Sequence, residues 1–295
     1  MTADITPVIL QALQEGEVVR YSQFASLCIL FFDYVLTFGD EVNYFWKKDF
    51  GLGTALFFLN RYYSLFSSII DINAITSSRS LPVSDSICMK YFQWFAWGGL
   101  IATIIAASIM MARVYALYNL SKRLLAGLVA CLLACVSLSG WIAWRALGLF
   151  VASGQTQIQV PTGFMCNPQS LGVHLKLVWV PALAFDALLC GLVVRQVLKS
   201  HMISLNEENT VFLGTRRLPL VMLLMRDSVV YFIATCITYL TCTLFMALAP
   251  PHLEGVPLGC AMVIPPILCS RMMMNIRENH QQSKHETYII DYTQE

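Results

Sequence analysis

Seven long apolar stretches limit what this chain can fold into more than any other feature. They lie at residues 21–39, 51–72, 92–117, 124–147, 172–197, 225–249 and 256–276. A helix needs about 20 apolar residues to cross a bilayer. A spanning segment must also satisfy every backbone polar group, and the alternating pattern of a β-barrel is absent here, so these stretches predict helices. The expected fold is an all-α integral membrane bundle of seven transmembrane helices.

The composition agrees with a membrane location. Of the 295 residues 57% are hydrophobic and 13% are charged, whereas about a quarter of the residues of a soluble domain are charged. We expect residues 1–20 to form an external segment, residues 21–277 the membrane domain and residues 278–295 a flexible cytosolic tail. Residues 1–20 are polar and lack the basic start of a cleaved signal peptide.

The distribution of Lys and Arg predicts the orientation of the bundle. Thirteen of these residues fall on one side of the seven stretches and five on the other. Because cytosolic loops carry the excess of positive charge, the N-terminus should face outside and the C-terminus the cytosol, in the plasma membrane or an endomembrane. Membrane lipids are the expected surroundings. The net charge of +1 gives no reason to expect nucleic acid as a partner.

Two of the ten cysteines stand apart from the others. Eight lie in or against the predicted helices, where cysteine behaves as a small hydrophobic residue. Cys88 and Cys166 lie on the predicted outer face, where a disulfide can persist. We expect them to form a disulfide, the alternative being two free thiols. No Cys-x-x-Cys pair or His cluster indicates a metal site.

Arg61 interrupts an apolar run, "LFFLNRYYSLF", and must be neutralised in some way. Asp33 lies on the preceding predicted helix, on the same side of the membrane, and its side chain should lean toward Arg61. We expect an ion pair between them that holds the first two helices together. Two alternatives remain: Arg61 contributes to ligand binding or coupling, or it reaches toward Asp40 or Glu41 at the membrane surface.

Asp186 is a deep acid with no basic residue near it on its own predicted helix. It is either a protonated, hydrogen-bonded structural group or a contact for a cationic or polar ligand. Tyr231, Thr235 and Tyr239 are polar residues of the sixth predicted helix that could share a ligand cavity with it.

The cytosolic ends of the third and seventh predicted helices carry a second set of candidates. This set consists of Arg113, Tyr115, Tyr118, Arg271, Asn275 and Arg277. Arg and Tyr at helix ends are typical of contacts with lipid headgroups. The alternative is that Arg113 belongs to a surface that docks a cytosolic signalling partner.

Sequence motifs of enzymes are absent. We find no Gly-x-Ser-x-Gly elbow, no glycine loop for phosphate and no paired carboxylate motif. The sequence therefore predicts no catalytic residue and no cofactor.

Three segments resemble an uncharacterised family of fungal seven-helix membrane proteins that share an N-terminal domain of unknown function. They are "DYVLTFGDEVNYFWKKDFGLGTALFFLNRYYSLF" (33–66), "RVYALY" (113–118) and "SRMMMNIRE" (270–278). The resemblance implies a multi-pass membrane protein and implies no particular activity. In topology the chain is also similar to G-protein-coupled receptors, although Ala112 stands where the receptors have an acid before the arginine of their acidic-Arg-Tyr element.

These observations favour a receptor-like or sensor-like protein that is not an enzyme and binds a small molecule or lipid. The alternatives are a membrane-embedded enzyme acting on a lipid or isoprenoid, with Asp186 as its acid, and a transporter or scaffold. The lining of the central cavity should discriminate among them: converging acids would favour the enzyme, and a packed core the scaffold.

Overall fold

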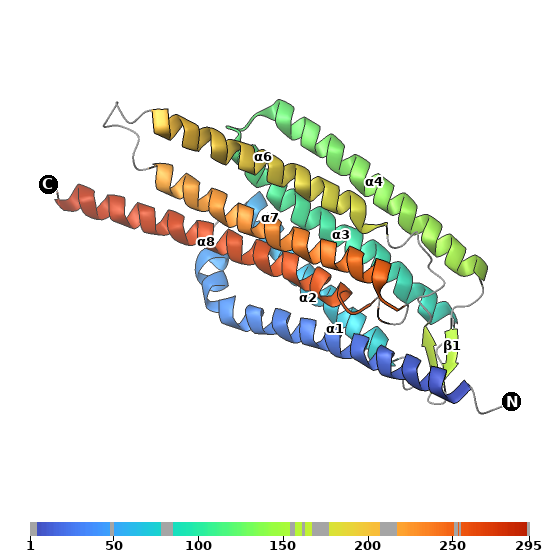
Figure 1. The fold of residues 1–295 in the computed structure, drawn as a ribbon. Helices are drawn as coiled ribbons and strands as arrows, with labels where there is room; N and C mark the ends of the chain where they lie inside the picture. Colours follow the sequence, from blue (N-terminus) through green and yellow to red (C-terminus); the bar gives the residue numbers. More distant parts are fainter. Residues whose placement is uncertain are drawn as a thin grey trace.

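The computed structural model describes residues 5–47, 50–77, 85–153, 157–160, 163–166, 177–206, 217–250, 253 and 255–293. Seven long helices run side by side, up and down one bundle (Figure 1). They are α1 (Ile5–Glu41), α2 (Leu52–Ser77), α3 (Asp85–Leu117), α4 (Lys122–Ser153), α6 (Trp179–Asn206), α7 (Arg217–Leu248) and α8 (Leu258–Thr293). A short π-helix, η1 (Val42–Trp46), ends α1, and the strands β1 (Gln157–Val160) and β2 (Gly163–Cys166) form an antiparallel hairpin.

The helices form a closed ring. Each packs against the next along the chain, and α8 packs back against α1. Inside the ring α3 also contacts α6 and α8, and α2 contacts α8. The N-terminus and the hairpin lie at one end of the bundle, called here the N-terminal end, and the C-terminus projects beyond the other, the C-terminal end (Figure 1).

Six of the described helices are long and apolar enough to cross a membrane, so the chain is a multi-pass membrane protein. The helix that does not meet this criterion is α2, although its 26 residues are long enough, about 39 Å at 1.5 Å per residue. Its buried face is polar and contains Thr54, Asn60, Arg61, Ser64, Ser68 and Asp71. These residues lower the hydropathy of α2, so its crossing of the membrane as a seventh span stays a prediction. The orientation of the bundle also stays a prediction.

Apolar side chains cover much of the surface of the bundle, as expected for a protein surrounded by lipid. On α1 Phe31, Phe32 and Leu36 are exposed, whereas the neighbouring Asp33 and Thr37 are buried. A water-soluble helix has the opposite arrangement. The first helix therefore turns its apolar face outward and its polar face toward α2 and α8.

Most helices extend beyond the predicted apolar stretches. The first begins at Ile5 and includes most of the segment expected to lie outside the membrane domain. The last continues to Thr293, so residues 278–293, which we expected to form a flexible tail, are helical in the structure. Hydropathy detects only the part of a helix that lies in lipid, and the polar turns at its ends give no such signal.

Candidate functional site

Arg61 lies at the centre of a polar cluster at the C-terminal end of the bundle. Its Nε atom is 2.8 Å from Glu41 Oε2, and both side chains are almost fully buried, with exposures of 2% and 0%. Its Nη2 atom donates hydrogen bonds to Thr37 Oγ1 (2.8 Å) and to the backbone carbonyl of Tyr34 (3.1 Å). The guanidinium also lies 4.0 Å from the centre of the Tyr34 ring. The charge of Arg61 is thus neutralised within the protein.

Glu41 receives two further hydrogen bonds on its other oxygen. Trp46 Nε1 and Tyr62 Oη donate to Glu41 Oε1 at 2.9 and 3.0 Å. The contact between Glu41 Oε2 and Arg61 Nε is ionic, because the two atoms are close but not aligned as a hydrogen bond. We call Tyr34, Thr37, Glu41, Trp46, Arg61 and Tyr62 the Glu41–Arg61 cluster. It connects α1, η1 and α2.

The predicted ion pair between Asp33 and Arg61 is wrong. Asp33 Oδ1 instead accepts a hydrogen bond of 2.5 Å from Nε of Arg271 on α8, whose side chain is 51% exposed. The prediction compared depth along α1 and α2 only, and it left out α8, which packs against both. The sequence analysis left two alternatives for Arg61, and the second is the one found. Arg61 reaches toward Glu41, but the pair is buried and does not lie at the membrane surface.

Arg277, in the second half of α8, connects this helix to η1 and α2. Its Nη1 atom donates to the backbone carbonyl of Tyr44 (2.6 Å) and its Nη2 atom to Thr54 Oγ1 (2.7 Å). The guanidinium stacks 3.9 Å from the centre of the Phe45 ring. Two of the predicted helix-end arginines, Arg271 and Arg277, therefore bind to neighbouring helices within the bundle.

The other predicted helix-end residues are placed as follows. Tyr118 Oη donates a hydrogen bond of 2.9 Å to the backbone carbonyl of Leu192 and so connects the end of α3 to α6. Arg113 and Tyr115 are half-buried on α3, and Asn275 is exposed on α8. After Tyr118 the chain turns through Asn119 and Leu120, whose φ angles of 56° and 59° are in the left-handed region.

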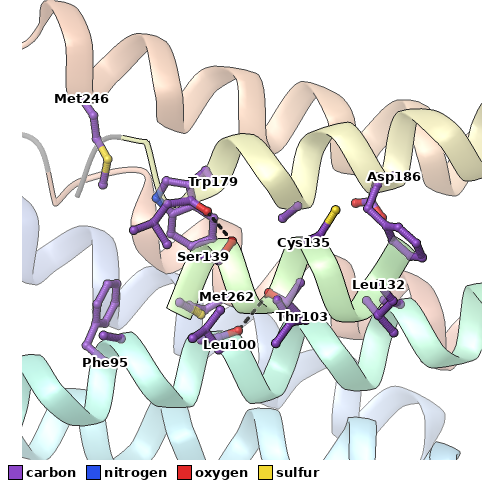
Figure 2. A pocket seen from close by; sticks show the side chains of 17 residues that line it. Phe95, Leu100, Thr103, Leu132, Cys135, Ser139, Trp179, Asp186, Met246 and Met262 are labelled. Carbon is purple, nitrogen blue, oxygen red and sulfur yellow. Dashed lines mark hydrogen bonds between the residues drawn. The ribbon is translucent and has the colours of Figure 1, made fainter. Parts of the chain in front are cut away.

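A cavity of about 50 Å³ lies between α3, α4 and α6. One residue of α7, Met246, and one of α8, Met262, also line it. Figure 2 shows the lining side chains, with Asp186 and Leu132 toward one end and Phe95 and Met246 toward the other. Most of the lining is apolar; the other side chains are Thr103, Cys135, Ser139, Trp179 and Asp186.

Asp186 is 8% exposed and lines the cavity. Within the described part of the chain no hydrogen bond or ion pair is formed by its carboxyl group. Tyr231, Thr235 and Tyr239, grouped with it in the sequence analysis, are buried on α7 and are not among the lining residues. Tyr239 packs against the lining residue Trp179, with its ring centre 5.7 Å from that of Trp179.

Sequence reasoning overlooked a buried acid, Asp71. Asp71 on α2 is 8% exposed, and its Oδ1 atom has no hydrogen-bond partner in the described structure. Trp94 Nε1 on α3, the helix that packs against α2, is also buried without such a partner. Asp71 lies near the end of the second apolar stretch, directly after Ile69 and Ile70. An acid so close to an apolar run was the available signal.

The predicted disulfide lies outside the part of the structure in which side chains are described, because Cys88 and Cys166 are not among those residues. It stays a prediction. The eight cysteines with described side chains are free. Within the described residues, no group of three or more His, Cys, Asp or Glu could hold a metal ion.

Comparison with known proteins finds a similarity for one segment of the chain. No curated protein and no solved structure matches the chain. Residues 21–66 match a family of unknown function, DUF6533. The matched segment covers the second half of α1, η1 and the first half of α2, and it contains every member of the Glu41–Arg61 cluster. This segment of the chain is therefore similar to an uncharacterised domain family.

Proposed function

We propose that this membrane protein is receptor-like or sensor-like and binds a small ligand in the cavity between α3, α4 and α6. The cavity is the observation that carries the proposal, because a scaffold would fill this space with side chains. Its lining is mostly apolar with a small number of polar groups, which is typical of small-molecule sites.

The chemistry of the lining supports binding more than turnover of a lipid. Among the described lining residues, Asp186 is the single acid. An enzyme that protonates a lipid or isoprenoid at one point and removes a proton at another needs two positioned groups. General acid–base catalysis by carboxyl groups commonly uses a pair of them. One acid in an apolar slot suits recognition of a polar group on a ligand.

The helices that line the cavity also extend to the C-terminal end of the bundle. Lining residues on α3 extend from Phe95 to Ala107, and the same helix ends at Leu117 beside the turn. Six residues after Asp186, the carbonyl of Leu192 accepts the hydrogen bond of Tyr118. Met262 lies on α8, which carries Arg271 and Arg277 farther along. A ligand that moved α3, α6 or α8 would thus alter the surface offered to a cytosolic signalling partner.

The test uses a substitution in place of the unknown ligand. Ala182→Phe adds a phenyl group to the cavity, whereas Ala184→Phe adds the same group to an exposed position of α6. Hydrogen–deuterium exchange is measured on both variants and the wild type in lipid nanodiscs. For Ala182→Phe we expect the amide exchange rates of residues 113–117 to change by about fivefold or more. A factor of about five is the lower end of the usual range of allosteric coupling.

The control variant, Ala184→Phe, should leave those rates unchanged. A change confined to the cavity segments of α3, α4 and α6 would contradict the proposal and favour a passive binding protein. Equal changes in both variants would also contradict it, because they would show general destabilisation of the bundle.

A further inference from the structure

The size of the cavity limits its ligand to very small species. Its volume is about 50 Å³. An engineered cavity that binds benzene has about 150 Å³, whereas one buried water needs about 10–15 Å³. The space therefore has room for about three to five waters and not for an organic ring.

Three side chains of the lining can bind water. Thr103 Oγ1 donates to the carbonyl of Gly99 (2.9 Å) and Ser139 Oγ to that of Val178 (3.2 Å), as the dashed lines in Figure 2 show. Each hydroxyl oxygen still accepts a hydrogen bond. The carboxyl group of Asp186 lines the same space. Because a buried water usually has two to four polar partners, we expect water beside these three side chains.

The cavity extends from Asp186 toward the N-terminal end of the bundle. Trp179, the first residue of α6, lines it together with Val178 directly before the helix. Asp186 follows Trp179 by two helical turns, about 10 Å along α6. Water in the cavity would therefore lie between Asp186 and the N-terminal end. In the orientation that the distribution of Lys and Arg predicts, this end faces outside.

Asp186 is surrounded by side chains that are uncharged at neutral pH. It is buried, and in the described part of the chain its carboxyl group forms no hydrogen bond or ion pair. Thiols and phenols ionise at about pH 8.5 and 10. Five such groups on three helices are close enough to interact with Asp186 electrostatically: Cys190 on α6, Tyr231, Cys236 and Tyr239 on α7, and Cys269 on α8.

The other two helices of the cavity add no positive charge to its lining. Cys135 is the titratable lining residue of α4, and the described lining of α3 has none. Arg113 of α3 interacts with Cys269 and does not line the cavity. An ionised Asp186 would thus need new partners, either more water in the cavity or donors brought closer by a movement of α6. The two protonation states of Asp186 therefore favour different arrangements of the cavity.

We propose that the cavity is a proton-binding site, in which a hydronium ion transfers its proton to the carboxylate of Asp186. The new bond is the O–H bond of the neutral acid, and the hydronium ion becomes a water of the cavity. This inference deepens the proposed function and rests on it, because it names the proton as the ligand of the same cavity. The protein would then sense acidity on the outer side of its membrane.

The first experiment follows the carboxyl group by infrared difference spectroscopy. The full chain is studied in dodecyl maltoside micelles, because this detergent has no carbonyl group. A protonated carboxyl group has a C=O stretching band that a carboxylate lacks. We expect this band to grow as the pH is lowered from about 8 to about 6, a range in which exposed Asp and Glu stay ionised.

Matched variants assign the band. Asp71→Asn removes a buried acid that does not line the cavity, and a band that depends on pH should remain. Asp186→Asn keeps the size of the side chain and removes the proton-binding group, so the double variant with Asp71→Asn should lack the band. A band of equal strength in the wild type and Asp186→Asn would overturn the inference. If Asp186→Asn does not fold, absence of the band in Asp71→Asn overturns it.

The second experiment tests whether the proton acts as a ligand. Amide exchange of residues 113–117 is measured in nanodiscs at pH about 6 and about 8, and each rate is divided by the intrinsic rate at the same pH. We expect the ratio to change by about fivefold or more in the wild type and in Asp71→Asn, and to stay constant in Asp186→Asn.

A wild-type ratio that does not depend on pH would overturn the inference, and so would a dependence that Asp186→Asn leaves intact. None of these results contradicts the proposed function. The exchange experiment with Ala182→Phe tests that function at a single pH, so the two failures can be told apart.

Discussion

At the scale of single residues, the buried charges of this protein differ in how they are balanced. Glu41 and Arg61 balance each other. Trp46 and Tyr62 donate hydrogen bonds to Glu41, and Arg61 donates one to Thr37. Asp33 is balanced by Arg271, which is half exposed. Asp186 has no partner in the described structure. A buried ion pair is costly to break because one uncompensated charge remains, whereas a pair open to solvent loses much less. Loss of one partner should therefore destabilise the protein more at the Glu41–Arg61 pair than at the Asp33–Arg271 pair.

Removal of the charge of Glu41 should destabilise the protein strongly. Glu41→Gln leaves Arg61 buried without its counter-charge, and we expect the free energy of unfolding to fall by about 3–5 kcal/mol. Asp33→Asn should cost less than about 1 kcal/mol, because solvent can hydrate Arg271. Denaturant titration in detergent micelles, followed by tryptophan fluorescence, measures both changes.

Asp40→Asn is the control for this comparison, since Asp40 is exposed beside Glu41. It should have no measurable effect. A larger loss of stability in Asp33→Asn than in Glu41→Gln would show that the pair with Arg271 is the dominant one.

At the scale of helices, α1 and α8 approach each other closely where both have small residues. A Cβ atom at Gly259 would lie 2.6 Å from Ser26 Oγ and 3.1 Å from Ser26 Cβ. Nearby, Ser22 Oγ donates to the carbonyl of Val256 (2.6 Å) and Gln23 Nε2 to that of Gly255 (3.2 Å). In a membrane there is little hydrophobic force between helices, so close packing and hydrogen bonds provide the association. Gly259 is therefore required by packing and not by backbone conformation.

Two glycine substitutions should have opposite effects. Gly259→Ala forces α1 and α8 apart and should lower the free energy of unfolding by about 1–3 kcal/mol, as overpacking does. Gly127→Ala on α4 meets no atom within 4 Å, and it should raise this free energy by up to about 1 kcal/mol through helix propensity. Thermal unfolding in detergent micelles measures both. Stabilisation by Gly259→Ala would mean that the two helices are farther apart than the structure shows.

At the scale of the whole molecule, the number of membrane crossings depends on α2. Seven crossings put the two termini on opposite sides of the membrane, and six, without α2, put them on the same side. The polar residues of α2 face Tyr34 and Thr37 of α1, Pro266 and Ser270 of α8 and the α3 interface. Because other helices bind the polar groups of Asn60, Arg61 and Tyr63, α2 can cross a bilayer despite its low hydropathy. We therefore expect seven crossings.

An assay with terminal tags tests the count and the orientation together. Protease delivered to the cytosolic side should remove a tag placed after Glu295 and leave a tag placed before Met1 intact. The excess of Lys and Arg on the C-terminal side is the reason for this direction. Loss of both tags, or of neither, would mean that α2 does not cross. Loss of the N-terminal tag alone would reverse the orientation.

The sequence by itself determined the class of the protein, because hydropathy is a local property of each stretch. It placed Arg61 and Asp186 correctly as buried charges, since any ionisable residue deep in an apolar run must be accommodated. It could not assign their partners. The packing of α1 against α2 brings Glu41 and Arg61 together, and Asp33 contacts a residue 238 positions later. The cavity is lined by α4 and not by the tyrosines of α7. These contacts depend on which helix faces pack together, and only the tertiary structure decides that.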